Sequence, residues 1–121
     1  MRTLAQTRAT NALNASKIKG MGVGQKGGNA LSGFPMLIKT DGLLAAGAFS
    51  VELNAKGEPK QEGAKLIMNA VAEHLASLGI CQAKVARDLV EELARAGDGS
   101  QLRRATVEAL AFLNYLKRFV A

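Results

Sequence analysis

The sequence contains few residues of the kinds that cross-link chains or bind metals. Among its 121 residues are one cysteine, Cys81, and one histidine, His74. A single cysteine cannot form an intrachain disulfide, and one cysteine with one histidine cannot supply the four ligands of a structural zinc site. We therefore expect no metal and no other cofactor, and a protein that works in a reducing compartment.

The sequence also has no apolar run of the ~20 residues that are needed to cross a bilayer. Its longest candidate, residues 42–51, has half that length. Residues 1–12 lack the hydrophobic core of a signal peptide. These absences predict a cytoplasmic protein that does not associate with a membrane.

Acidic residues are absent from the first third of the chain. Residues 1–40 carry six lysines and arginines and no acid, whereas residues 41–121 carry ten residues of each sign. The net charge of +6 therefore comes entirely from the first 40 residues. Such one-sided charge indicates a polyanion partner, because lysine and arginine gain affinity for a phosphate backbone by releasing counterions. The alternative is that a moderate net charge only keeps a small protein soluble.

Patterns typical of β-strands are missing as well. No segment alternates apolar and polar residues for long, valine and isoleucine are few, and alanine and leucine dominate. The chain is long enough for one domain with its own core. We predict an all-α fold, a single compact bundle of five or six helices over residues 1–121. Residues 1–28 would form a basic N-terminal helix and a glycine-rich loop, and residues 29–121 the helical core.

Helical periodicity and capping residues locate the elements of this bundle. We expect one helix to begin at Thr40–Asp41, where the carboxylate can cap it, another to end at Gly79, and the last to begin at Ser100 as N-cap. A polar loop is expected at residues 55–63. The predicted helices cover residues 2–19, about 42–54, 63–78, 83–96 and 100 to near the C-terminus.

The segment GMGVGQKGG, residues 20–28, concentrates five glycines around Lys26. It is not a P-loop, because Lys26 has the wrong neighbours, and the G-x-G-x-x-G of residues 22–27 lacks the preceding strand of a dinucleotide site. The G-x-x-G of residues 24–27 fits the loop with which KH domains clamp nucleotides, although that module also needs a three-stranded sheet. The plain alternative is a flexible link between helices.

Catalytic groups are scarce. His74 falls at the edge of an apolar helix face, which is typical of a packed histidine, and Cys81 has no close basic neighbour to lower its pKa. Glu91 and Glu92 are adjacent, so they point to different sides of a helix. We therefore expect that the protein is not an enzyme.

Two segments resemble one family. Residues 34–52, FPMLIKTDGLLAAGAFSVE, and residues 103–121, RRATVEALAFLNYLKRFVA, are similar to the helix-turn-helix segment and the C-terminal helix of the small subunit of type III-B CRISPR effector complexes, the Cmr or RAMP-module small subunit. Residues 64–80 match the middle helix of that family in pattern. Gly47 is a departure from the family pattern. Alanine would be more favourable in a helix at this position by ~1 kcal/mol.

The resemblance implies a non-catalytic helical bundle that takes part in antiviral defence. Its implied partners are guide RNA and target RNA, the repeated backbone subunit and the large subunit of the complex, and further copies of itself placed head to tail. By this resemblance Lys39, Lys117 and Arg118 are candidates for contact with RNA phosphates, and the charge distribution adds Lys17, Lys19 and Lys26. The alternative function is a free-standing nucleic-acid-binding domain, either KH-like or a helical DNA-binding protein.

Overall fold

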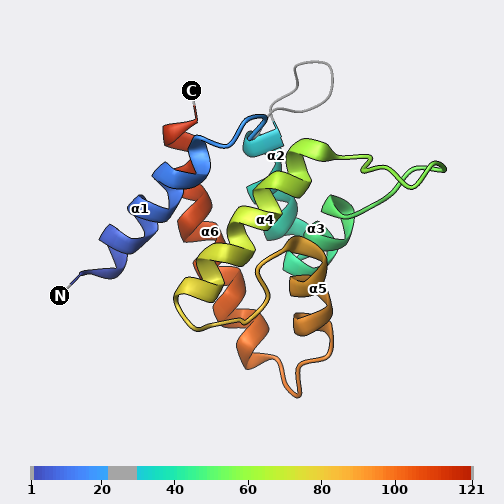
Figure 1. The fold of residues 1–121 in the computed structure, drawn as a ribbon. Helices are drawn as coiled ribbons and strands as arrows, with labels where there is room; N and C mark the ends of the chain where they lie inside the picture. The colour runs from blue at the N-terminus through green and yellow to red at the C-terminus, as the bar shows by residue number, and fades with distance from the viewer. Residues whose placement is uncertain (1, 22–29, 121) are drawn as a thin grey trace.

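The computed structural model of the protein describes residues 2–21 and 30–120, and their regular structure is helical (Figure 1). No strand occurs in these residues; the nearest approach is an isolated antiparallel bridge between Leu53 and Pro59. The prediction of an all-α bundle with five or six helices is therefore confirmed. The helices are α1 (Leu4–Ser16), α2 (Ala30–Asp41), α3 (Leu43–Ser50), α4 (Glu62–Ser77), α5 (Ala86–Ala94) and α6 (Ser100–Phe119).

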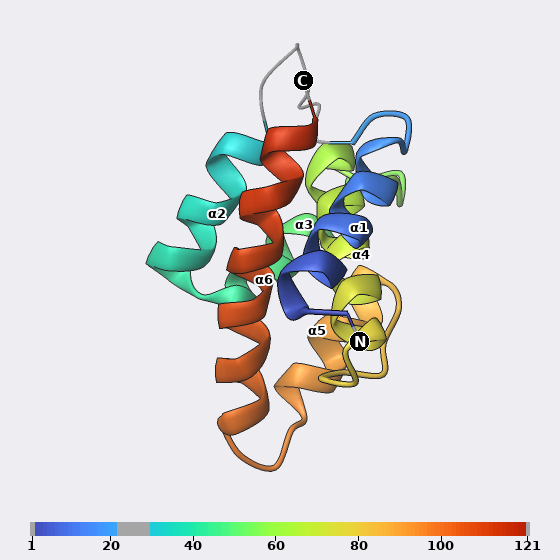
Figure 2. The same ribbon diagram turned by 90° about the vertical axis from the view of Figure 1, so that its left-hand side faces the viewer.

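The longest helix, α6, packs against α1, α2 and α4, whereas α5 packs on α3 and α4. Figure 2 shows it running the length of the molecule with α2 on one side and α1 on the other, and α4 also packs against it. Its apolar residues recur at helical spacing, which buries one broad face. The buried apolar side chains of α6 are Ala105, Ala109, Phe112, Leu113 and Leu116, and those of α4 include Ile67, Met68, Val71 and Leu75. In residues 2–21 and 30–120, no helix combines the length and the hydrophobicity needed to cross a membrane.

Two predicted helix caps are displaced by one or two residues. Asp41 is the last residue of α2 rather than the cap of α3, and Gly42, with a φ of 95°, separates the two helices. The break falls there because only glycine adopts positive φ without strain. Ser100 is the first residue of α6 rather than its N-cap, because Asp98 accepts from both its backbone nitrogen (2.8 Å) and its hydroxyl (2.6 Å). Gly79 does follow the end of α4, with a φ of 75°.

The first helix buries little of its apolar surface. Ala12 is buried, whereas the side chains of Leu4, Leu13 and Ile18 are 46%, 45% and 44% exposed. Thus α1 packs through the small side chains of Ala12 and Ala15 and through polar contacts described below.

The glycine-rich loop predicted at residues 20–28 falls almost wholly outside the described residues. Only Gly20 and Met21 are described; Gly20 has a φ of 86°, and Met21 is buried. The loops at residues 22–28 and the cation Lys26 stay predictions.

The packing of neighbouring helices explains why glycine occupies position 47 in α3, which the local sequence does not show. A Cβ at this position would lie 2.6 Å from Cγ2 of Val90 in α5 and 3.1 Å from Cε of Met68 in α4. Valine is branched at Cβ and cannot easily swing away. The absent side chain therefore lets three helices approach closely, and this offsets the poor helix propensity of glycine.

We expect Gly47→Ala to lower the free energy of unfolding by about 1 kcal/mol, because overpacking costs about 1–3 kcal/mol and the gain in helix propensity is about 1 kcal/mol. Gly33→Ala is the matched control, since a Cβ on this α2 glycine would meet nothing within 4 Å. That variant should gain about 0.5–1 kcal/mol. Urea unfolding followed by circular dichroism measures both, and a stabilised Gly47→Ala would contradict the packing argument.

Candidate nucleic-acid interface and the adjoining polar core

Four of the six candidate cations gather at one end of the bundle. Lys17 is the C-cap of α1 and Lys19 follows it, while Lys117 and Arg118 lie in the last turn of α6. The C-terminal ends of α1 and α6 lie at the same end of the molecule in both ribbon views (Figures 1 and 2). All four side chains are exposed. We call this set, Lys17, Lys19, Lys117 and Arg118, the basic end.

The contact between the two helices explains this alignment. Arg8 of α1 touches Glu108 of α6, and the helices run in the same direction from there. Lys17 and Lys117 each follow nine residues later, which is about 13.5 Å along a helix. One contact in the middle of the two helices therefore sets both groups of cations at a similar height.

Nothing in the neighbouring sequence neutralises the basic end. Residues 1–40 contain no acid, and neither do residues 109–121. Within the described part of the chain, none of its four side chains forms an ion pair. The C-terminal end of a helix carries partial negative charge. This charge attracts the cations in the last turn, Lys117 and Arg118 in α6.

The remaining two candidates do not join this set. Lys39 lies in the last turn of α2, whereas it is the beginning of α2 that lies near the C-terminal end of α6 (Figure 2). Its side chain is exposed and lies nine residues, or about two and a half helical turns, from that beginning. Lys26 lies outside the described residues. The structure thus separates Lys39 from Lys117 and Arg118, although all three belong to segments that carried the family resemblance.

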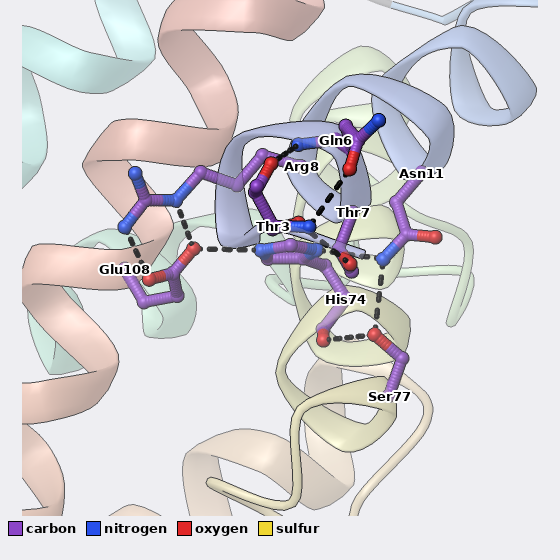
Figure 3. A network of polar contacts seen from close by, with 8 residues as sticks. All are labelled: Thr3, Gln6, Thr7, Arg8, Asn11, His74, Ser77 and Glu108. Carbon is purple, nitrogen blue, oxygen red and sulfur yellow. Dashed lines mark hydrogen bonds and ion pairs between the residues drawn. The ribbon is translucent and has the colours of Figure 1, made fainter. Parts of the chain in front are cut away.

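A buried polar network connects α1, α4 and α6 (Figure 3). Arg8 donates from Nε to Oε2 of Glu108 over 2.7 Å and from Nη2 to Oε1 over 2.8 Å, a bidentate pair. The same Oε2 lies 2.9 Å from Nε2 of His74. On the other side of the ring, Nδ2 of Asn11 lies 2.8 Å from Nδ1 of His74 and donates to the hydroxyl of Ser77 over 3.0 Å. We call Arg8, Asn11, His74 and Glu108 the polar latch.

The partners of His74 select its neutral form. A carboxylate oxygen can only accept, so Nε2 carries the proton that it receives, and Nδ1 accepts from the amide of Asn11. The ring is 1% exposed and stacks on Phe112 with centroids 4.5 Å apart. Burial lowers the pKa of His74, and the hydrogen bond and charge of Glu108, which act in the opposite direction, do not restore it. This confirms the expectation of a packed histidine.

The carboxylate of Glu108 remains ionised in this setting. Burial acts to raise its pKa, but the hydrogen bonds and charges of Arg8 and His74 outweigh burial and leave the pKa below its ordinary value. The hydrogen bond to Glu108 likewise raises the pKa of Arg8. Two opposite charges therefore compensate each other beside a neutral imidazole, and the polar latch carries no net charge.

The contacts of Cys81 and Glu92, the other candidate catalytic groups, indicate structural roles. Burial raises the pKa of the Cys81 thiol to about 11, so it is protonated at neutral pH and is a poor nucleophile. Glu92 accepts from the backbone nitrogens of Gln82 (3.0 Å) and Ala83 (2.9 Å) and from Gln101 (2.8 Å). It thereby ties the segment after α4 to α5 and α6. Residues 2–21 and 30–120 hold no cluster of three or more histidine, cysteine or acidic side chains that could bind a metal.

Sequence reasoning missed the polar latch. The one signal was Glu108 itself, an acid between Ala105 and Phe112 on the apolar face of α6. Its partner, Arg8, is 100 residues away. A periodic pattern can predict that an acid is buried, but it cannot identify a contacting residue so far away in the sequence.

The KH-like alternative fails on architecture. A KH domain needs a three-stranded sheet beside its helices, and the described residues contain no sheet. The dinucleotide-binding alternative fails similarly, because α1 rather than a strand precedes the glycines.

Comparison with known proteins finds a family match over nearly the whole chain. The family model described as CRISPR-associated protein (Cas_Cmr5) matches residues 4–121. This range includes all six helices and every residue of the basic end and of the polar latch. Neither the curated proteins nor the solved structures gave a match.

Replacing Arg8 by Met should lower the free energy of unfolding by about 2–3 kcal/mol, because it leaves the carboxylate of Glu108 buried without its cation. The double variant with Arg8→Met and Glu108→Gln should be more stable than Arg8→Met alone, since it removes the unpaired charge. Urea unfolding at pH 7 measures both. A loss within about 0.5 kcal/mol, as at an ordinary surface position, would show that the pair is unimportant.

Acid should destabilise the protein through His74. Because the pKa of His74 is lower in the folded protein than the unfolded value of 6.5, the unfolded chain binds more protons as the pH falls through about 6.5. Stability should therefore fall between about pH 7.5 and 5.5, while the variant His74→Gln should be nearly flat in this window. The chain has no other histidine to confuse the comparison. Wild-type stability that stays constant or rises on acidification would contradict a neutral His74.

Proposed function

The chain belongs to the CRISPR-associated Cmr5 family and is a subunit of a CRISPR-associated Cmr complex; we propose that it is the non-catalytic small subunit of a type III-B effector ribonucleoprotein. In this role it lines the channel where guide and target RNA pair and contacts their backbone phosphates. It acts in the cytoplasm, in antiviral defence. Its protein partners are the repeated backbone subunit, the large subunit and further copies of itself placed head to tail.

The basic end is the observation that carries the RNA-binding part of this proposal. It joins cations from two helices that are far apart in sequence, on segments with no acid over residues 1–40 and 109–121. A phosphate backbone attracts such a cluster by counterion release and by direct charge-assisted hydrogen bonds. Lys39 would contribute a second, separate contact.

The aromatic side chains favour phosphate contact over base stacking. Phe34 and Phe112 are buried, whereas Phe49 and Phe119 are exposed, at 36% each. Phe119 follows the cations of α6 but its ring pairs with Tyr115, with centroids 6.5 Å apart. Proteins that read single strands through bases use freely presented aromatic platforms. Contact through phosphates is largely independent of sequence, which suits a subunit whose complex reads sequence by base pairing with the guide.

The test is fluorescence anisotropy of the full chain with labelled single-stranded RNA at several salt concentrations. Replacing Lys117 and Arg118 by Ser should weaken binding and reduce the slope of log affinity against log salt by about 1.4, at about 0.7 per lost phosphate contact. Replacing Lys56 and Lys84 by Ser is the matched control, because it removes the same charge from exposed positions elsewhere. That control should leave the slope nearly unchanged.

Three results would reject this proposal. Equal effects of the two double variants would mean that net charge alone attracts RNA. Salt-independent binding would exclude a phosphate interface. A clear preference for duplex DNA over RNA would favour the alternative of a helical DNA-binding protein.

A further inference from the structure

A groove lies on a side of the molecule that the proposed RNA contacts do not use. It has a volume of about 510 Å³, between the beginning of α1, the residues after α4 and the first half of α6. Its walls include Leu4, Leu78, Ile80 and Val107. The side chain of Val107 is 68% exposed and that of Leu4 is 46% exposed. Aliphatic groups from three helices or their ends thus converge on one open depression.

The rim of this groove is positively charged. Arg103 and Arg104 line it from α6, and neither forms an ion pair within residues 2–21 and 30–120. The one acid in the lining is Glu108, but both its oxygens are occupied by Arg8 and His74. The groove therefore offers an apolar floor with two guanidinium groups beside it and no available carboxylate.

We propose that this groove binds a segment of a partner protein that carries an aliphatic anchor flanked by acidic residues. The aliphatic floor suits a leucine-like side chain, and a planar guanidinium pairs bidentately with a carboxylate. RNA fits less well, because its phosphates could pair with the arginines but would leave the aliphatic floor of the groove without an apolar partner.

The polar latch holds the groove in shape. Leu4, one wall, belongs to α1, and Arg8 one turn later in α1 is fixed to Glu108, which itself lies in the lining. Val107 precedes Glu108 on α6, so the two walls are joined through one buried ion pair. A groove formed by rigid helices binds a peptide without first ordering a loop, which lowers the entropic cost of binding.

The test uses fluorescence anisotropy with a short labelled peptide in which glutamates flank leucines, and a second peptide with the leucines replaced by serine. The full chain should bind the leucine peptide at least about tenfold more tightly than the serine peptide. Val107→Asp should weaken binding by about tenfold or more, and Leu4→Asp, from the opposite wall, should do the same. Met36→Asp is the matched control, because Met36 is 61% exposed and lines no part of the groove. Its affinity should stay within about twofold of the wild type.

The arginines are tested separately. Replacing Arg103 and Arg104 by Ser should weaken binding of the leucine peptide and flatten its salt dependence, because exposed charge pairs are screened by salt. Equal binding of both peptides, or no effect of Val107→Asp and Leu4→Asp, would overturn the proposal. So would loss of RNA binding in Val107→Asp, which would assign the groove to nucleic acid. Dissociation of a wild-type oligomer by Val107→Asp in sedimentation experiments would assign it to a second copy and overturn the proposal as well.

Discussion

The placement of α1 depends on one bidentate contact, between Arg8 and Glu108. The helix contributes only Ala12 and Ala15 to the buried core, which is too little apolar surface to fix its position along α6. The two hydrogen bonds of 2.7 and 2.8 Å supply a defined register instead. A buried ion pair often adds little net stability, but it penalises every arrangement that leaves one charge unpaired. Its role here is therefore to specify one alignment of α1.

Periodicity alone predicted α4 to within one residue at each end and α6 from its first residue, because each helix has a broad apolar face and a clear break before or after it. It predicted α1 as a helix within residues 2–19 but not how that helix packs, because burial there falls on small residues and the remaining attachment is polar. It also counted Gly47 as a defect, since the cost of glycine to a helix is visible in the local sequence whereas the room it gives Val90 is not. Local patterns thus predict which segments are helical better than how they pack.

The candidate site shows the same division between composition and geometry. The absence of acids in the first 40 residues predicted a concentration of positive charge there, yet a count along the chain cannot say which cations share a surface. Two of the four cations of the basic end, Lys117 and Arg118, lie outside those 40 residues. The parallel run of α1 and α6 brings Lys17 and Lys117 to one end, whereas the turn at Gly42 ends α2 elsewhere and leaves Lys39 apart. The family resemblance rested on two segments, and the family match extends it to residues 4–121, including the N-terminal part for which charge was the only argument.

The polar latch links two surfaces that otherwise have nothing in common. Through α1 it positions Lys17 and Lys19 of the basic end, and through the same helix it positions Leu4 in the wall of the groove. Because Arg8 and Glu108 cancel each other's charge and His74 is neutral, the latch itself adds no field that could attract RNA or an acidic peptide. Weaker binding after a change in the latch would therefore report a displaced α1 rather than a lost contact. The two surfaces can be told apart only by substitutions at their exposed residues, with α1 left in place.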